Sequence, residues 1–88
     1  MIHREGDWLS AKVGDQLVMM SASEGKYLSL SEVGARIWEL IETPKSREDL
    51  CATLVTEYDV TPEQCRREVD DFLAMLAKES AARIDAAA

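Results

Sequence analysis

Apolar and polar residues alternate early in the chain at the spacing of β-strands. Trp8–Val13 (WLSAKV) alternates with period two, and we interpret Gln16–Ser21 and Lys26–Leu30 as two further strands. Gly14 stands between the first two segments, where glycine tolerates the positive φ of a tight type II′ hairpin turn. A second turn that ends at Gly25 leads into the third segment. The pattern predicts a three-stranded antiparallel meander whose first and third strands are its edges.

After residue 30 the spacing of apolar residues becomes helical. Ser31 is the expected N-cap of a first helix, and Pro44 ends that helix because a proline drives the preceding residue out of the α region. Ser46 is positioned to cap a second helix. Thr61 is positioned to cap a third, with a proline at the first helical position and Gln64 completing a capping box. The sequence thus predicts three helices after the three strands.

These elements give the order β-β-β-α-α-α, an α+β fold in which a three-stranded antiparallel meander is followed by three helices. The 88 residues correspond to a single domain. A chain of this length buries only about 60–65% of the surface that it exposes when unfolded, which leaves little room for a deep catalytic cavity. We expect the polar residues 1–7 and the alanine-rich residues 81–88 to be flexible.

The chain is acidic, since 10 basic and 17 acidic residues give a formal charge of −7. Nucleic-acid-binding proteins usually present a basic patch to the phosphates, so binding to DNA or to an anionic membrane is disfavoured. No apolar run reaches the ~18 residues of a transmembrane helix, and the first ten residues lack the apolar stretch of a signal peptide. With two cysteines that form no CxxC motif, we expect a reduced, cytoplasmic protein.

The sequence offers little material for catalysis. His3, the sole histidine, lies in the segment expected to be flexible, whereas a general base needs a fixed position near its target. Cys51 and Cys65 fall on the apolar stripes of two predicted helices, where a free cysteine behaves as a small hydrophobic residue. Glu68 and Asp70 lie far apart around the third helix, which argues against a metal site. We expect no enzyme activity, no cofactor and no metal.

The predicted third strand, Lys26–Leu30, has the composition of an open sheet edge. An edge strand leaves backbone N–H and C=O groups unpaired, and proteins usually protect such edges with proline or a bulge. KYLSL contains no proline and has a single lysine at its start. Such an edge can accept a strand from another chain, with main-chain hydrogen bonds supplying the affinity. The residues leave open the alternative that a helix or the C-terminal tail covers this edge.

Several motifs resemble those of the PqqD family. Lys26–Trp38 (KYLSLSEVGARIW) combines a strand ending in Tyr-x-x-Leu with a helix carrying Glu-Val-Gly-x-x-Ile-Trp. Arg47–Leu50 opens the next helix, Glu57–Val60 follows it, and the last helix has an acid, a valine and Phe-Leu at positions 68, 69, 72 and 73. The similarity covers roughly residues 8–80. The chain departs from the family at residues 77–84, where members often end in Gly-Leu and a hydrophobic residue, so the resemblance does not extend to the C-terminal contact surface.

The resemblance implies a winged helix-turn-helix fold that performs no chemistry. Members of the family bind the leader segment of a ribosomally made precursor peptide, as an added strand in a groove between the third strand and third helix. They present the precursor to a modifying enzyme. The short form here looks most like members from lasso-peptide clusters, whose partners are a leader-cleaving cysteine protease and an ATP-dependent macrolactam synthetase. The alternatives are a chaperone for a radical S-adenosylmethionine enzyme and, less favoured by the charge, a winged-helix DNA-binding regulator.

The resemblance also assigns residues to the peptide site. The third strand would supply backbone pairing and pocket walls. The third helix would supply further contacts, and the alternative for each of these residues is a role in the core only. Gly34 is expected to allow a close approach, and Trp38 to anchor the core. Dimerisation through the same edge strand is left open. The expected peptide-binding residues are Tyr27, Leu28, Ser29, Leu30, Glu68, Val69, Phe72 and Met75.

Overall fold

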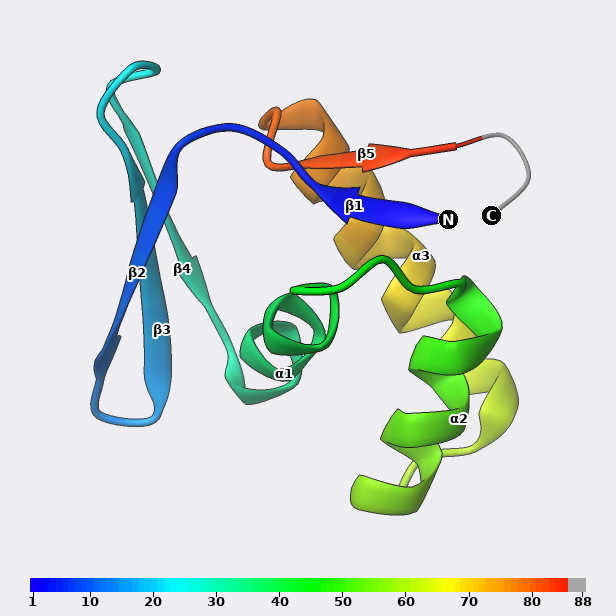
Figure 1. Cartoon of the computed structure of the whole chain (residues 1–88). Helices are drawn as coiled ribbons and strands as arrows, with labels where there is room; N and C mark the ends of the chain where they lie inside the picture. Colours follow the sequence, from blue (N-terminus) through cyan, green and yellow to red (C-terminus); the bar gives the residue numbers. More distant parts are fainter. Residues whose placement is uncertain (86–88) are drawn as a thin grey trace.

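A computed structural model describes residues 1–85 of the chain (Figure 1). Strands precede and follow a block of three helices, and a three-stranded sheet lies to one side of those helices. The elements in chain order are β1 (Ile2–Arg4), β2 (Trp8–Val13), β3 (Gln16–Ser21), β4 (Lys26–Leu30), α1 (Glu32–Leu40), α2 (Arg47–Glu57), α3 (Pro62–Lys78) and β5 (Ala82–Ile84).

The predicted meander is confirmed. β2, β3 and β4 form an antiparallel sheet in that order, so β2 and β4 are its edges. Val13 pairs with Gln16, which leaves a two-residue hairpin loop. Gly14 has a φ of +66°, while Asp15 has no positive φ, as a type II′ turn requires. The Gly14-Asp15 turn therefore fixes the β2–β3 register that the sequence predicted.

The predicted helix starts are confirmed, with one correction. The Ser46 hydroxyl accepts a hydrogen bond of 3.0 Å from a backbone N–H in the first turn of α2. The Thr61 hydroxyl accepts one of 3.1 Å from the backbone N–H of Gln64. The capping box is incomplete among residues 1–85, since no hydrogen bond joins the Thr61 backbone N–H to the Gln64 side-chain oxygen; the Gln64 amide nitrogen donates to a Glu68 carboxylate oxygen at 3.3 Å. Ser31 occupies the N-cap of α1 without a side-chain hydrogen bond.

The expectation of flexible ends is corrected for β1 and β5. Ile2–Arg4 pairs antiparallel with Ala82–Ile84, and Ile2 is fully buried. The backbone N–H of Ile2 also donates to the Lys45 carbonyl at 2.7 Å. Arg4 lies 4.3 Å from the ring centroid of Trp38, a cation–π contact. A strand of three residues, such as β1, is too short to show a hydrophobic period, and its partner β5 lies some eighty residues along the chain. Periodicity in the sequence therefore could not predict this pair.

The chain turns from α3 into β5 through a Schellman motif. The backbone N–H of Ser80 donates to Ala77 at 3.1 Å, and that of Ala81 donates to Leu76 at 2.8 Å. Ser80 has a φ of +60°, the left-handed conformation in which this motif usually holds glycine. The turn sends β5 back towards β1 (Figure 1). Residues 86–88 of the tail that was expected to be flexible lie outside the described residues.

One hydrophobic core joins the sheet to the helices. Leu17, Met19 and Leu30 extend from the inner face of the sheet and are buried among the apolar faces of the helices. Trp38 is buried, as its predicted role as a core anchor requires. The order of three antiparallel strands followed by three helices confirms the predicted α+β fold, to which β1 and β5 are added. Within residues 1–85, the helices are too short or too polar to cross a membrane.

Candidate functional site

The free edge of β4 is the first feature of the candidate site. Among residues 1–85, β4 pairs with β3 alone. Leu28 and Leu30 face the core, whereas Tyr27, at 75% exposure, and Ser29 face outward. The segment Ala82–Ile84 pairs with β1, so this part of the C-terminal tail does not cover β4. Unpaired backbone groups on this edge can form hydrogen bonds to an added strand.

The helix α3 lies alongside this edge. At one end, Lys26 of β4 forms an ion pair of 3.4 Å with Glu79, just after α3. At the other end, Ser31, just after β4, lines one cavity together with Phe72 and Glu68 of α3. The strand from Lys26 to Ser31 spans ~16 Å, and the helix from Glu68 to Glu79 also spans ~16 Å. These two contacts bracket the free edge of β4 and the second half of α3, and we use the name β4–α3 groove for the region between them, in which one cavity lies at the Ser31 end.

A cavity of about 330 Å³ lies at the α1 end of this groove. Phe72 packs directly on Gly34 at this cavity. A Cβ at position 34 would lie only 2.8 Å from Cε1 of Phe72. Gly34 thus permits the close approach that its sequence context predicted. Residues from α1, its N-cap and α3 line the cavity: Ser31, Val33, Gly34, Ile37, Glu68, Asp71 and Phe72.

The charges of this cavity are negative. Glu68 and Asp71 line it, and no basic residue among residues 1–85 does. The Glu68 carboxylate accepts a hydrogen bond from the Gln64 side chain at 3.3 Å and lies on the exposed surface. Apolar walls with carboxylates at the rim suit an aliphatic side chain, or the aliphatic stem of a lysine or arginine. The opposite end of the groove is neutralised by the Lys26–Glu79 pair.

The structure brings most of the predicted site residues to this groove. The four β4 residues form its strand edge, and Glu68 and Phe72 line its cavity. Met75 is half-buried one turn further along α3. Val69 is only 1% exposed and lines cavities beside α2, so the structure does not bring it to this groove. The contacts of these residues with a peptide remain predictions.

Four lining residues were missed by the sequence reasoning, and one of them, Ser31, was expected only as the N-cap of the first helix. Val33 and Ile37 are four residues apart on α1, a spacing that marks them as apolar without telling core from groove. Asp71 is exposed and lies among other charged residues of α3, and this pattern does not distinguish a site residue from a solvated one. The available signal was the small residue Gly34 between Val33 and Ile37, because a conformationally costly glycine inside a helix indicates a close neighbour.

The groups considered for catalysis are held in structural contacts. His3 is fixed in β1, where its Nε2 lies 3.0 Å from an Asp85 carboxylate oxygen. Burial, and then contact with Cys51, raise the pKa of the Cys65 thiol to about 11. That thiol therefore stays protonated at neutral pH and is a poor nucleophile. Among residues 1–85, no three histidine, cysteine or acidic side chains are grouped so as to hold a metal ion.

Comparison with known proteins now identifies the family. The sequence model of coenzyme PQQ synthesis protein D (PqqD) matches residues 16–81, three quarters of the chain. The chain belongs to the PqqD family. The match confirms the resemblance found in Lys26–Trp38 and includes both β4 and α3, the two walls of the groove. No curated protein matches the chain.

Two solved structures resemble this PqqD-family chain over nearly its whole length. One is described as "TbiB1 in Complex with the TbiA(beta) Leader Peptide"; it is 31% identical, with a TM-score of 0.84, and the match covers 96% of this chain and 98% of that one. The other is "Lasso peptide synthetase B1 complexed with the leader peptide"; it is 19% identical, with a TM-score of 0.82, and the match covers 94% of this chain and 98% of that one. The second likeness supports the fold only.

Proposed function

We propose that this PqqD-family chain is a non-catalytic adaptor that binds the leader segment of a precursor peptide in the β4–α3 groove. The observation that carries the proposal is the unpaired edge of β4 lying opposite α3, with an apolar cavity at one end. The leader adds to the sheet as a strand beside β4. The 31% identical TbiB1 structure supports the assignment, because it holds a leader peptide.

The groove supplies two kinds of affinity. Each main-chain hydrogen bond to β4 contributes about 0.5–1.5 kcal/mol net. An aliphatic leader side chain in the cavity beside Phe72 contributes about 1.5–3 kcal/mol by leaving water. Neither contribution depends strongly on ionic strength. The leader is therefore expected to bind tightly at high salt, unlike DNA, whose binding falls steeply with salt.

The carboxylates of Glu68 and Asp71 add a preference for charge. A lysine or arginine of the leader can lay its stem on Phe72 and bring its cation to this rim. Because these acids are exposed, the preference is worth at most about 1 kcal/mol, or roughly a fivefold change in affinity. Asp71→Asn should lower the affinity by up to that factor, while Glu63→Gln, on the first turn of α3, should leave it unchanged.

Delivery of the bound precursor needs a second surface, and the outer face of the sheet provides one. Leu9, Met20 and Tyr27 are direct neighbours across the three strands and are 75%, 53% and 75% exposed. No charged residue of β2, β3 or β4 lies on this face in the part of the chain that the structure describes, although 31% of the chain is charged. Its outward positions are Leu9, Ala11, Val13, Gln16, Val18, Met20, Tyr27 and Ser29.

The size of this face favours an enzyme over a second copy of the chain. Its four large exposed apolar side chains present roughly 500 Å², near the top of the range for monomers. Two copies would then bury about 1,000 Å², below the ~1,200–2,000 Å² of stable interfaces. A strand added to β4 extends the same face. We therefore assign it to the modifying enzyme: a leader-cleaving cysteine protease with a macrolactam synthetase in the lasso-type assignment, or a radical S-adenosylmethionine enzyme as the runner-up.

Fluorescence anisotropy of a labelled leader peptide tests the binding proposal. We expect saturable binding that survives a rise from about 0.05 to about 0.5 M salt and is lost with a scrambled leader. Phe72→Ala should weaken binding at least about tenfold, because it removes the cavity wall. Leu9→Ala, on the outer face, is the matched control and should bind normally. Equal binding of the scrambled leader would refute the proposal. Binding of DNA in place of the leader would refute it as well.

A further inference from the structure

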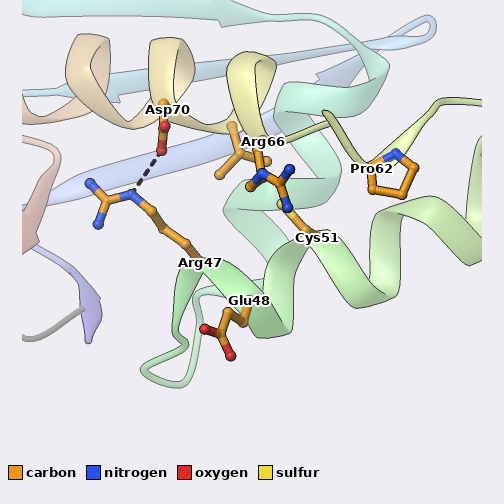
Figure 2. Close-up of a pocket in the computed structure, with 7 residues that line it drawn as sticks. Arg47, Glu48, Cys51, Pro62, Arg66 and Asp70 are labelled. Atoms are coloured by element: carbon orange, nitrogen blue, oxygen red, sulfur yellow. Dashed lines mark hydrogen bonds and ion pairs between the residues drawn. The ribbon is translucent and has the colours of Figure 1, made fainter. Parts of the chain in front are cut away.

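A second cavity lies between α2 and α3 (Figure 2). Its volume of about 230 Å³ is below the ~300–1,000 Å³ of sites for small-molecule ligands, so it holds a side chain rather than a cofactor. Three residues of α2 and four of α3 line this α2–α3 pocket: Arg47, Glu48, Cys51, Pro62, Arg66, Val69 and Asp70.

The α2–α3 pocket lies on the opposite flank of α3 from the β4–α3 groove. At 100° per residue, Arg66 and Asp70 point about 160–200° away from Glu68, which lines the groove. The buried stripe of α3 separates the two flanks; it consists of Cys65, Val69, Leu73 and Leu76. A ligand in this pocket therefore does not compete for space with a leader in the groove.

The floor of the pocket is apolar, and an ion pair crosses its edge. Cys51, Pro62 and Val69 form the apolar part of the lining. Arg47 Nε lies 2.8 Å from an Asp70 carboxylate oxygen, and this ion pair ties α2 to α3 at the edge of the pocket (Figure 2).

Arg66 supplies a positive charge at the rim of a pocket whose lining also holds Arg47, Glu48 and Asp70. No ion pair of Arg66 occurs among residues 1–85, although acidic residues outnumber basic ones in the chain. Glu48 lines the same pocket, but its carboxylate points away from the Arg66 guanidinium (Figure 2). A guanidinium beside an apolar floor is a strong receptor for a carboxylate, which it can bind in a bidentate manner. A doubly charged phosphate is less suitable, because Asp70 and Glu48 line the pocket too.

We propose that the α2–α3 pocket is a docking site for an acidic segment of a partner protein. The segment inserts one aliphatic side chain over Cys51 and Val69 and places a neighbouring carboxylate on Arg66. The local charge at Arg66 selects this occupant, because Asp70 is paired with Arg47 and the Glu48 carboxylate points away from Arg66 (Figure 2). This site is independent of leader binding and gives the adaptor a third surface.

The test is an NMR titration of the ¹⁵N-labelled full chain with two blocked dipeptides, acetyl-Leu-Glu-amide and acetyl-Leu-Gln-amide. The acidic probe should shift the amides of Cys51, Arg66 and Val69 and bind about two- to fivefold more tightly than the neutral one, because Arg66 is exposed. Arg66→Gln should abolish that difference. Arg67→Gln, the neighbouring residue outside the pocket lining, is the matched control and should retain it. The acidic dipeptide should cause the same shifts when it is added to a chain already saturated with leader.

Several results would overturn this assignment. Equal affinity for the two dipeptides would exclude recognition of the carboxylate by Arg66. Absence of shifts up to about 10 mM, or shifts confined to the β4–α3 groove, would exclude the pocket as their site. Shifts of Cys51 and Arg66 that depend on protein concentration without any probe would show that a second copy of the chain occupies it.

Discussion

Replacing Gly34 with alanine adds one methyl group where α1 meets α3, and its effect depends on Phe72. A Cβ on Gly34 would lie 2.8 Å from Cε1 of the Phe72 ring. Ordinary carbon contacts lie at ~3.5–4.0 Å, so the ring must retreat by roughly 0.7 Å or more. Because Phe72 lines the cavity of the β4–α3 groove, this retreat changes the shape of the leader site.

Two opposing contributions set the change in the free energy of unfolding. Alanine inside a helix is favoured over glycine by about 1 kcal/mol. Overpacking a filled contact costs about 1–3 kcal/mol. Gly34→Ala should therefore lower the free energy of unfolding by up to about 2 kcal/mol in the wild-type chain. In a Phe72→Ala background the clash is gone. The same Gly34→Ala substitution should then raise the free energy of unfolding by about 1 kcal/mol.

Urea denaturation of the wild type, both single variants and the double variant measures this coupling. Anisotropy with labelled leader measures the accompanying loss of affinity, which we expect to be about fivefold for Gly34→Ala. A coupling energy below about 0.5 kcal/mol would refute the packing of Phe72 on Gly34. Stabilisation by Gly34→Ala in the wild-type background would refute it as well.

Three further predictions concern the parts that frame the site. Ser80→Gly should raise the free energy of unfolding by about 1 kcal/mol in urea denaturation, because Ser80 holds a φ of +60°; Ser80→Ala should bring no gain. Cys65, buried and with its pKa raised to about 11, should resist iodoacetamide until the chain unfolds, whereas half-buried Cys51 reacts first; equal rates would contradict this. The His3 hydrogen bond lowers the pKa of Asp85 below 3.8, so the stability that Asp85 adds is present above that pH and is lost as the pH falls through the lower folded value. The stability difference between wild type and Asp85→Asn should accordingly shrink on acidification, and a constant difference would contradict the pairing.

Local signals predicted most of the fold. Period-two alternation located the strands, Gly14 located the hairpin turn, and the hydroxyls of Ser46 and Thr61 located two helix starts. These features depend on interactions within a few residues, which a single sequence reveals. The β1–β5 pair depends on contacts between the two ends of the chain. Burial of Ile2 and the Arg4–Trp38 contact hold that pair in place, and neither has a local pattern.

The candidate site was predictable on its strand side and less so on its helix side. A sheet edge follows from strand order, so Lys26–Leu30 could be identified before the structure was known. On α3, an apolar stripe shows that Val69 and Phe72 leave water, but not which neighbour they meet. The packing of α2 places Val69 in the core, and the packing of α1 turns Phe72 towards the groove. The contribution of Asp71 emerged only with that geometry.

Backbone amide exchange of β4 with and without the leader peptide tests strand addition most directly. An added strand pairs with the N–H groups that point away from β3, which alternate along Lys26–Leu30. We predict that saturating leader slows the exchange of these alternate amides at least about tenfold, while the amides of the opposite edge strand β2 keep their rates. Leader binding that leaves the β4 amides unprotected, or that protects those of β2 instead, would contradict the account.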